Sequence, residues 1–256
     1  MQGRRPSETT MLRRWLVVLA LLALAPISFT APYVLLEPDQ PEEVVAFPSD
    51  IVPQPEGYLL VVLDGVGENI MRDATMMPKL VERLDEQAVL SITTGPLTLS
   101  ATCVREMMTG VPNAPIDGLK NFNMGHPGGF DPWLLAAGSE QHSVGMIGSY
   151  VMGNMYGDAS NIEFINTFEG HADYYEGDRA TGDILEQWLV DGRHNVIAAH
   201  FSGPDKVGHK WGTVSEEYRN KMLDMDQHLS SLLRFVPANW TVVVTADHGM
   251  TASGSH

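Results

Sequence analysis

Three apolar runs in this sequence predict strands that are buried on both faces. They are YLLVVLDGV (58–66), NVIAAHFSGPD (195–205) and NWTVVVTADHG (239–249). A strand covered on both faces loses the usual alternation of apolar and polar residues, and this is typical of the centre of a parallel sheet. The runs therefore require a fold in which other elements cover both sides of a mainly parallel sheet.

The segments between these runs have the spacing of helices and further strands. Strands are also expected at 88–95 and 142–149, and helices at 77–87, 101–110, 181–192 and 215–236. Ser215 is a good N-cap for the last helix, and Gly110 is a natural stop for the second. Residues 111–131 and 150–178 have no regular pattern. Strands alternating with helices predict an α/β domain from residue 58 to residue 256.

Composition limits the class of protein and its partners. The chain has 256 residues, of which 44% are hydrophobic, enough for one sizeable core. Its net charge of −16 disfavours binding to nucleic acid, because both surfaces would be negative. Cys103 is the only cysteine, so no disulfide forms within the chain. No feature of the sequence indicates a protein partner.

The N-terminus predicts a membrane helix. Residues 15–36 carry no charge, and all four arginines of this region lie before them. The positive-inside rule then makes residues 1–14 a cytoplasmic basic tail and places the later residues on the extracytoplasmic side. Residues 37–57 are rich in Pro, Glu and Asp and are expected to be a linker. Two alternatives are a cleaved signal peptide, with its apolar stretch at 15–25, and a buried helix of a soluble domain.

Carboxylate and imidazole side chains follow the three buried strands. In open parallel sheets a ligand site lies beyond the carboxyl ends of the strands, so these side chains should converge on one edge. Mixed oxygen and nitrogen donors suit Zn²⁺ or Mn²⁺. His200 lies in the middle of a strand and is predicted to be a hydrogen-bonded core histidine. The six candidate ligands are enough for two divalent metal ions: Asp64, Asp205, His209, Asp247, His248 and His256.

A nucleophile is expected near such a pair of metals, because paired metals suit an in-line displacement at phosphorus. The segment PLTLSATCVREMMTG (96–110) is a strand-to-helix turn with three candidate hydroxyls, those of Thr98, Ser100 and Thr102. Metal and helix dipole would both favour an ionised hydroxyl at the helix start. Alternatively, Ser100 or Thr98 only caps the helix.

These residues resemble the alkaline phosphatase superfamily, and within it the glycosylphosphatidylinositol (GPI) ethanolamine phosphate transferases. The likeness is carried by REMMTG, IDGLKNFN, DKVGHKWG and DHGMTASGSH. It implies a three-layer sandwich with a mainly parallel central sheet, and Ser100 as nucleophile. It also implies one zinc on Asp64, Asp247 and His248, a second on Asp205, His209 and His256, and phosphate contacts from Asn121 or Asn123.

The resemblance and the predicted membrane helix together suggest a transferase. It would move a phosphoethanolamine-like group from a phospholipid to a glycolipid-type acceptor through a covalent Ser100 intermediate. A hydrolytic phosphodiesterase or nucleotide pyrophosphatase is the alternative within the same fold. An inactive, membrane-tethered binding module is the alternative from another class.

Overall fold

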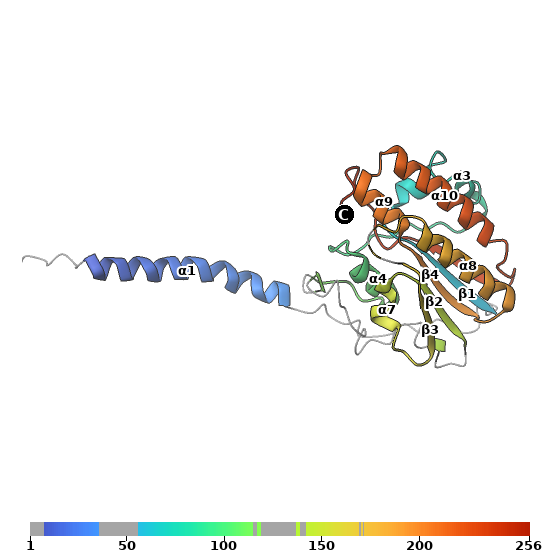
Figure 1. Ribbon diagram of the computed structural model, residues 1–256. Helices are drawn as coiled ribbons and strands as arrows, with labels where there is room; N and C mark the ends of the chain where they lie inside the picture. The colour runs from blue at the N-terminus through green and yellow to red at the C-terminus, as the bar shows by residue number, and fades with distance from the viewer. Residues whose placement is uncertain are drawn as a thin grey trace, which may run out of the picture.

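The computed structural model describes residues 8–35, 56–114, 117–118, 137–138, 142–168, 170 and 172–256. Its centre is a five-stranded, entirely parallel sheet with the order β3-β2-β4-β1-β5 (Figure 1). The strands are β1 (Gly57–Leu63), β2 (Val144–Gly148), β3 (Ile162–Asn166), β4 (Val196–Phe201) and β5 (Trp240–Thr245). The predicted parallel sheet is therefore confirmed, with the three apolar runs as its neighbouring strands β4, β1 and β5.

Helices cover both faces of this sheet, as the continuous apolar runs require (Figure 1). One face packs against α8 (Glu176–Asp191), α9 (Gly203–Trp211) and α10 (Glu216–Leu232), and the other against α4 (Ser100–Thr109) and α7 (Tyr150–Tyr156). Strand β1 shows the reason. Leu59 and Leu63 point into the first core and Leu60 and Val62 into the second, so neither side of the strand meets water.

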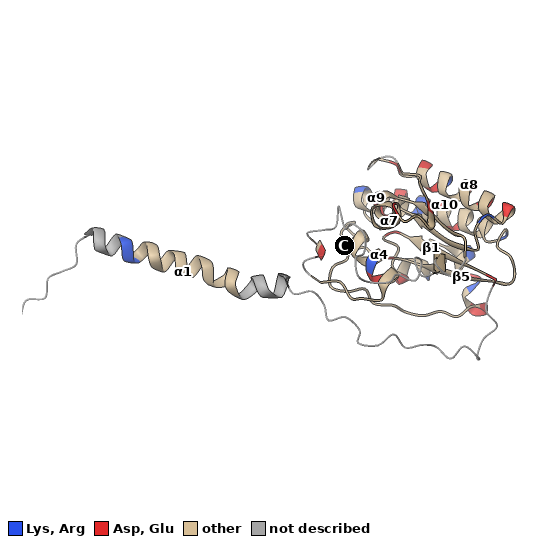
Figure 2. Ribbon diagram, turned by 90° about the horizontal axis from the view of Figure 1, so that it is seen from below, with Lys and Arg blue, Asp and Glu red and all other residues tan. Residues whose placement is uncertain are grey.

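Local signals fix several helix ends. Ser215 caps α10, where its Oγ accepts a hydrogen bond of 3.1 Å from the Tyr218 N–H. Gly110 ends α4 with a φ of 70°, a conformation that favours glycine, and its N–H donates to the Glu106 carbonyl. Acidic residues lie along the outer helices such as α8 and α10 (Figure 2), in keeping with the negative net charge.

Several predicted elements differ from the structure. No strand forms at 88–95; these residues and β5 line a cavity of about 750 Å³ instead of pairing. The helix expected at 77–87 is split into α3 (Pro78–Val81) and a 3-10 turn at Leu84–Glu86, after the short α2 (Glu68–Met71). The stretch 150–178 contains α7, β3 and the first turn of α8. The loop expected after β4 is helix α9, which begins with Gly203 and Pro204 because proline is tolerated in a first helical turn.

The N-terminal helix α1 spans Glu8–Leu35. Within the part of the chain that is described, no helix meets the length and apolarity needed to cross a membrane. The membrane span predicted at 15–36 is therefore not confirmed. Most of the predicted linker, 37–57, lies outside the described residues.

Candidate functional site: carboxylates and imidazoles around a serine

The topology brings the candidate ligands to the carboxyl edge of three neighbouring strands. Asp64 follows β1, Asp247 follows β5, and Asp205 lies in the first turn of α9, directly after β4. The Asp64 N–H donates to the Phe201 carbonyl at the end of β4, so the two strand ends stay in register. Strand β1 lies between β4 and β5, so this strand order brings the three carboxylates together at one edge of the sheet.

The first group consists of Asp64, Asp247 and His248, each at most 3% exposed. Both backbone N–H groups of Gly65 and His248 donate to Asp247 Oδ1, at 3.1 and 2.9 Å. That leaves Asp247 Oδ2 buried without a hydrogen-bond partner, 3.6 Å from His248 Nε2. A buried carboxylate oxygen with no donor is costly, so this atom is poised to bind a cation.

The tautomer of His248 follows from its surroundings. Its Nδ1 lies 3.1 Å from the Gly249 carbonyl oxygen. A carbonyl only accepts, so Nδ1 carries the proton and Nε2 presents a lone pair. Nε2 faces Asp64 Oδ1 at 3.5 Å and Ser100 Oγ at 3.3 Å. This is how metal-binding histidines are usually oriented, by a backbone acceptor on the other ring nitrogen.

Ser100 completes the first group. It is the first residue of α4, and Leu99, not Ser100 or Thr98, occupies the N-cap position, with no side-chain cap. Ser100 Oγ donates to Asp64 Oδ1 at 3.3 Å. Thr102, another candidate nucleophile, is fully buried and donates to the Leu99 carbonyl at 2.8 Å, so its hydroxyl points back into its own turn. Of these two hydroxyls, that of Ser100 faces the carboxylates.

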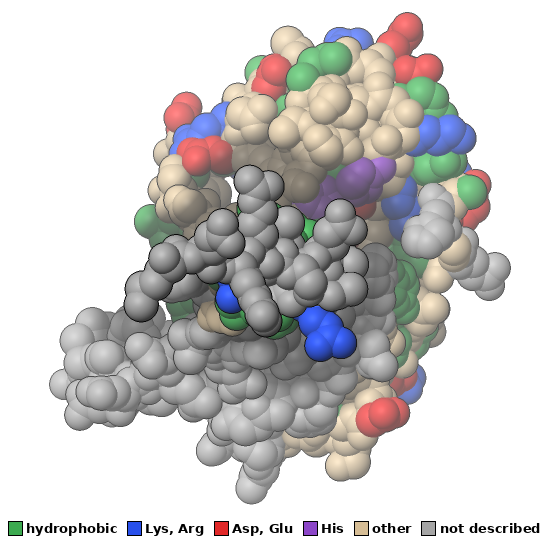
Figure 3. Space-filling model, turned by 90° about the vertical axis from the view of Figure 1, so that its left-hand side faces the viewer, with side chains coloured by type: hydrophobic (Ala, Val, Ile, Leu, Met, Phe, Trp, Pro, Cys, Tyr) green, Lys and Arg blue, Asp and Glu red, His purple; other side chains and the backbone are tan. Residues whose placement is uncertain are grey.

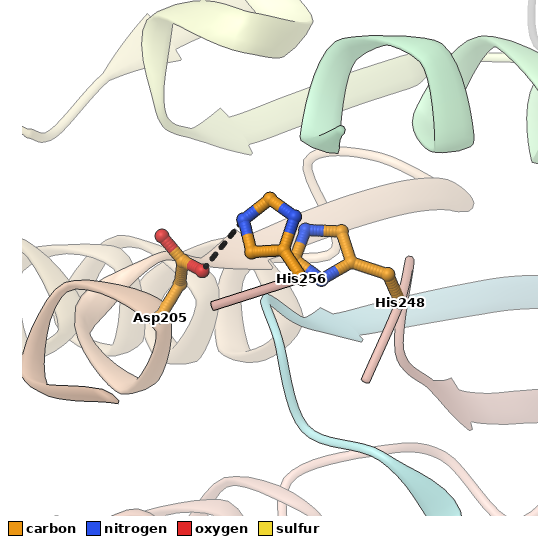
Figure 4. Close-up of side chains that lie close together, drawn as sticks. All are labelled: Asp205, His248 and His256. Atoms are coloured by element: carbon orange, nitrogen blue, oxygen red, sulfur yellow. Dashed lines mark ion pairs between the residues drawn. The ribbon is translucent and has the colours of Figure 1, made fainter. Parts of the chain in front are cut away.

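The second group gathers around Asp205. Its Oδ1 lies 3.4 Å from His209 Nε2 and 3.7 Å from His256 Nε2, and the two imidazole nitrogens are 3.1 Å apart. The His256 ring also stacks on that of His248, with centroids 3.9 Å apart (Figure 4). Asp205, His248 and His256 form a compact set of possible ligands, so His248 belongs to both groups. Histidine side chains reach the surface on this face of the molecule (Figure 3).

The distances fit divalent metals. Ligand atoms 2.0–2.2 Å from a tetrahedral zinc lie roughly 3.3–3.6 Å from one another. Four contacts within the first group, including those of Ser100, measure 3.3, 3.3, 3.5 and 3.6 Å. Those of Asp205, His209 and His256 are 3.1, 3.4 and 3.7 Å. Asp205 Oδ1 and Asp247 Oδ2 are both buried without a hydrogen-bond donor, so each group also has an unsatisfied carboxylate oxygen.

The three buried carboxylates of the cluster would be stabilised by a positive charge beside them. Burial raises the pKa of Asp64 well above its usual range, and the negative charges of Asp247 and Asp205 raise it further. Burial likewise raises the pKa of Asp247 and of Asp205. Burial lowers the pKa of His248 and of His256, so these rings stay neutral and can act as ligands.

His200 has a closer relation to the site than its position in β4 predicts. It is fully buried, and its Nδ1 is hydrogen-bonded to Ser149 Oγ at 2.9 Å, as expected for a core histidine. Its Nε2, however, lies 3.3 Å from Asp64 Oδ2. Parallel pairing sets His200 opposite Val62, two residues before Asp64, and the sequence alone does not give that register. His200 thus lies against the oxygen of Asp64 that does not face Ser100, although its Nε2 makes no hydrogen bond among the described residues.

The segment that is predicted to supply the phosphate contacts is described only at its start. Asn121 and Asn123 lie outside them. Asp117, from the same IDGLKNFN segment, is described: it pairs with Arg105 of α4 at 3.0 Å and accepts from the Ala114 N–H at 2.8 Å. This buried pair ties the start of that segment to the helix that carries Ser100.

Solved structures with the same fold include a phosphonoacetate hydrolase and an ectonucleotide pyrophosphatase/phosphodiesterase. A phosphonoacetate hydrolase from Sinorhizobium meliloti superposes with a TM-score of 0.53 at 18% identity, over 77% of this chain and 57% of that one. Murine ectonucleotide pyrophosphatase/phosphodiesterase 5, in complex with AMP, gives 0.54 at 15% identity over the same shares. At these identities the likeness establishes the fold.

Sequence relatives agree with the predicted resemblance. The catalytic subunit of GPI ethanolamine phosphate transferase 3 is 34% identical in mouse over 100 residues and 40% identical in human over 82 residues. These segments cover 39% and 31% of this chain but only 9% and 8% of the relatives, so the chain corresponds to a small part of their length.

The sequence profile of type I phosphodiesterases and nucleotide pyrophosphatases matches residues 119–255, which is more than half of the chain. This range contains Asp205, His209, Asp247 and His248, the ligand candidates that follow β4 and β5. The resemblance to the alkaline phosphatase superfamily is thereby confirmed. The chain belongs to the type I phosphodiesterase / nucleotide pyrophosphatase family.

Proposed function

We propose that this protein is a metal-dependent phosphoryl-type transferase in which Ser100 is the nucleophile. One observation carries the proposal: Ser100 Oγ stands at the start of α4, 3.3 Å from both Asp64 Oδ1 and His248 Nε2. The helix start favours negative charge on this oxygen. A hydroxyl in that position has no structural role as a cap, because the N-cap is Leu99.

Two divalent ions, zinc or manganese, fit the two groups. Asp64, Asp247 and His248 would hold one beside Ser100, and Asp205 with His209 and His256 would hold the other. Bound there, such ions supply Lewis acidity that stabilises negative charge on the reacting oxygens. His248 lies close to both groups. The hydrogen bond from its Nδ1–H to the Gly249 carbonyl keeps its Nε2 directed at them.

The reaction proceeds in two displacements at phosphorus. In the first, Ser100 Oγ forms a bond to phosphorus while the bond from phosphorus to the leaving alcohol breaks, and the serine proton ends on the departing oxygen. In the second, an acceptor hydroxyl forms a bond to phosphorus while the bond to Ser100 Oγ breaks, and the acceptor's proton ends on Ser100 Oγ. Asp64 orients the serine hydroxyl through Oδ1, which accepts its hydrogen bond.

The substrates we propose are a phospholipid donor of a phosphoethanolamine-like group and a glycolipid-type acceptor. Support comes from the mouse and human relatives, which are GPI ethanolamine phosphate transferases. The apolar side chains that α1 exposes, such as Trp15 and Leu22, support attachment of the chain to a membrane. The arginines before residue 15 would then place the catalytic domain on the extracytoplasmic side. Both substrates would then lie in the same bilayer as the enzyme.

A second candidate is hydrolysis, with water as the acceptor. It is favoured by the likeness to human ectonucleotide pyrophosphatase/phosphodiesterase family member 7, which is 29% identical over 91 residues. The metal groups and Ser100 serve both reactions equally, because the first displacement is the same. The two candidates differ only in what enters the second displacement.

Product analysis tests both candidates. The zinc-loaded protein is incubated with phosphatidylethanolamine labelled in the head group, with and without a glycolipid acceptor that carries free sugar hydroxyl groups. Labelled glycolipid indicates transfer, and free labelled phosphoethanolamine indicates hydrolysis. Trapping of the label on Ser100, located by peptide mass spectrometry, is expected in either case. A Ser100→Ala variant that turns over the donor at the wild-type rate would overturn the proposal.

A further inference from the structure

A buried ion pair lies beneath helix α9, outside the group of candidate ligands. Lys221 of α10 is fully buried and Asp178 of α8 is 1% exposed, and Lys221 Nζ pairs with Asp178 Oδ2. The ammonium group also stands 4.3 Å from the centre of the Tyr175 ring. Burying two charges is expensive, and an apolar pair of the same volume often serves stability as well. The ion pair is therefore expected to have a role other than stabilising the fold.

The other carboxylate oxygen of Asp178 contacts the start of helix α9. Asp178 Oδ1 accepts a hydrogen bond of 3.2 Å from the N–H of Gly203, the first residue of α9. Asp205 follows two residues later, and His209 lies in the last turn of the same helix. The carboxylate is thus attached at one oxygen to Lys221 and at the other to the helix that carries two of the candidate ligands.

The start of helix α9 has no side-chain cap among the described residues. Its N-cap, Ser202, makes no side-chain cap hydrogen bond, and Pro204 has no N–H to donate. The contact with the ion pair is also very close. A Cβ on Gly203 would collide with Asp178 Oδ2 and come within 2.8 Å of Lys221 Cε. The first turn of α9 therefore rests directly on the two buried charges.

We propose that Asp178 and Lys221 are positioning residues for the Asp205 half of the site. Lys221 fixes the Asp178 carboxylate, and Asp178 fixes the first turn of α9, so that Asp205 and His209 face His256. The proposal rests on the proposed function, in that these three residues are taken as metal ligands. Residues that orient metal ligands in this indirect way typically contribute ten- to a hundredfold to metal affinity.

Two double variants isolate the hydrogen bond from the charges. Both remove the two charges together, because removing one alone leaves the other buried and unpaired. Asp178→Asn/Lys221→Met keeps an amide oxygen that can accept from Gly203, whereas Asp178→Leu/Lys221→Met has no acceptor. Zinc affinity is measured on the full chain by competition with a chelator, and folding by urea denaturation.

The wild type and the Asn/Met variant are expected to hold two zinc ions with similar affinity. The Leu/Met variant should lose about ten- to a hundredfold in affinity for one of the two ions and keep the other. Equal affinity of the two double variants at both ions, with the fold retained, would overturn the proposal. A wild type that binds two zinc ions but shows no turnover would count against the proposed function alone.

Asp226→Leu is the matched control. Like Asp178, Asp226 is a buried carboxylate, but it lies on α10. It accepts hydrogen bonds from the N–H groups of Lys79 and Leu80 in α3, away from the candidate ligands. Its loss should lower stability without changing zinc affinity. If the Leu/Met variant does not fold, Gly203→Ala keeps both charges and displaces the first turn of α9 instead. Undiminished zinc affinity in Gly203→Ala would then contradict the proposal.

Discussion

Ser100 Oγ lies 3.3 Å from His248 Nε2, although 148 positions separate the two residues in the sequence. The contact exists because α4 begins at the same edge of the sheet at which β5 ends. The unprotonated nitrogen of His248 and the hydroxyl of Ser100 thereby share a small space with two buried carboxylates.

Replacing Ser100 by alanine should reduce turnover of a phosphodiester by at least about a thousandfold, as removal of a nucleophile does in other covalent enzymes. Zinc content should stay the same, because the three other ligands of the first group remain. Thr102→Ala is the control. Its hydroxyl bonds to the Leu99 carbonyl, so its loss should affect stability and leave turnover nearly unchanged.

Asp247→Asn should stabilise the metal-free protein. The pKa of Asp247 is raised by burial, so its folded form binds a proton more tightly than its unfolded form does. Protonated Asp247 therefore adds to the free energy of unfolding at low pH. This contribution is lost as the pH rises from the usual pKa of aspartate through the raised pKa of the folded protein. We expect urea denaturation in EDTA at pH 7 to show a gain of about 1 kcal/mol for the variant.

Adding zinc should reverse the order of stability of these two proteins. The wild type gains free energy by binding the ion to the folded state, and the variant lacks one charged ligand for it. Denaturation with a saturating concentration of zinc measures this directly. A variant that is less stable than the wild type in EDTA would show that Asp247 is not under electrostatic strain.

His200 should make stability depend on pH in the acid range. Burial lowers the pKa of His200 to about 4, whereas the unfolded chain binds the same proton near 6.5. The unfolded state therefore holds more protons between these values, so stability rises with pH over this window, by about 3 kcal/mol from this residue. In His200→Gln that part of the slope should be missing. Equal slopes for the two proteins, from denaturation at pH 4 to 7, would argue against a neutral His200.

Cys103 should be unreactive in the folded protein. Burial, with help from the charge of Asp247, raises the pKa of its thiol to about 12, so little thiolate exists at pH 8. A disulfide reagent such as Ellman's should label the native chain far more slowly than the urea-unfolded chain. Labelling at the unfolded rate under native conditions would mean that the helix α4 region opens readily.

The parallel core was predictable from sequence because its signal is local. The runs that become β4, β1 and β5 are apolar throughout, as burial on both faces demands, and Ser215 and Gly110 mark helix ends by their own chemistry. Segment 88–95 has the same β-branched composition but forms no strand, since a strand also needs a neighbour and none of the described residues pairs with it. Helix α9 was missed because Gly203, Pro204 and Gly208 have low helix propensity and packing on α10 overrides it.

The candidate site was predictable to the extent that it depends on strand ends. Asp64 and Asp247 follow apolar runs, and any parallel sheet brings such ends together. The contacts of His200 with Asp64 and of Asp178 with Gly203 depend on strand order and helix packing. Those are properties of the whole fold, so no spacing in the sequence points to them.

Anomalous diffraction from crystals of the zinc-loaded chain, recorded on both sides of the zinc absorption edge, would locate metal ions around the Ser100 oxygen. We expect two peaks roughly 4 Å apart, one against Asp64, Asp247 and His248 and one against Asp205, His209 and His256. Zinc bound elsewhere, or no zinc beside Ser100 at saturating concentration, would contradict this expectation.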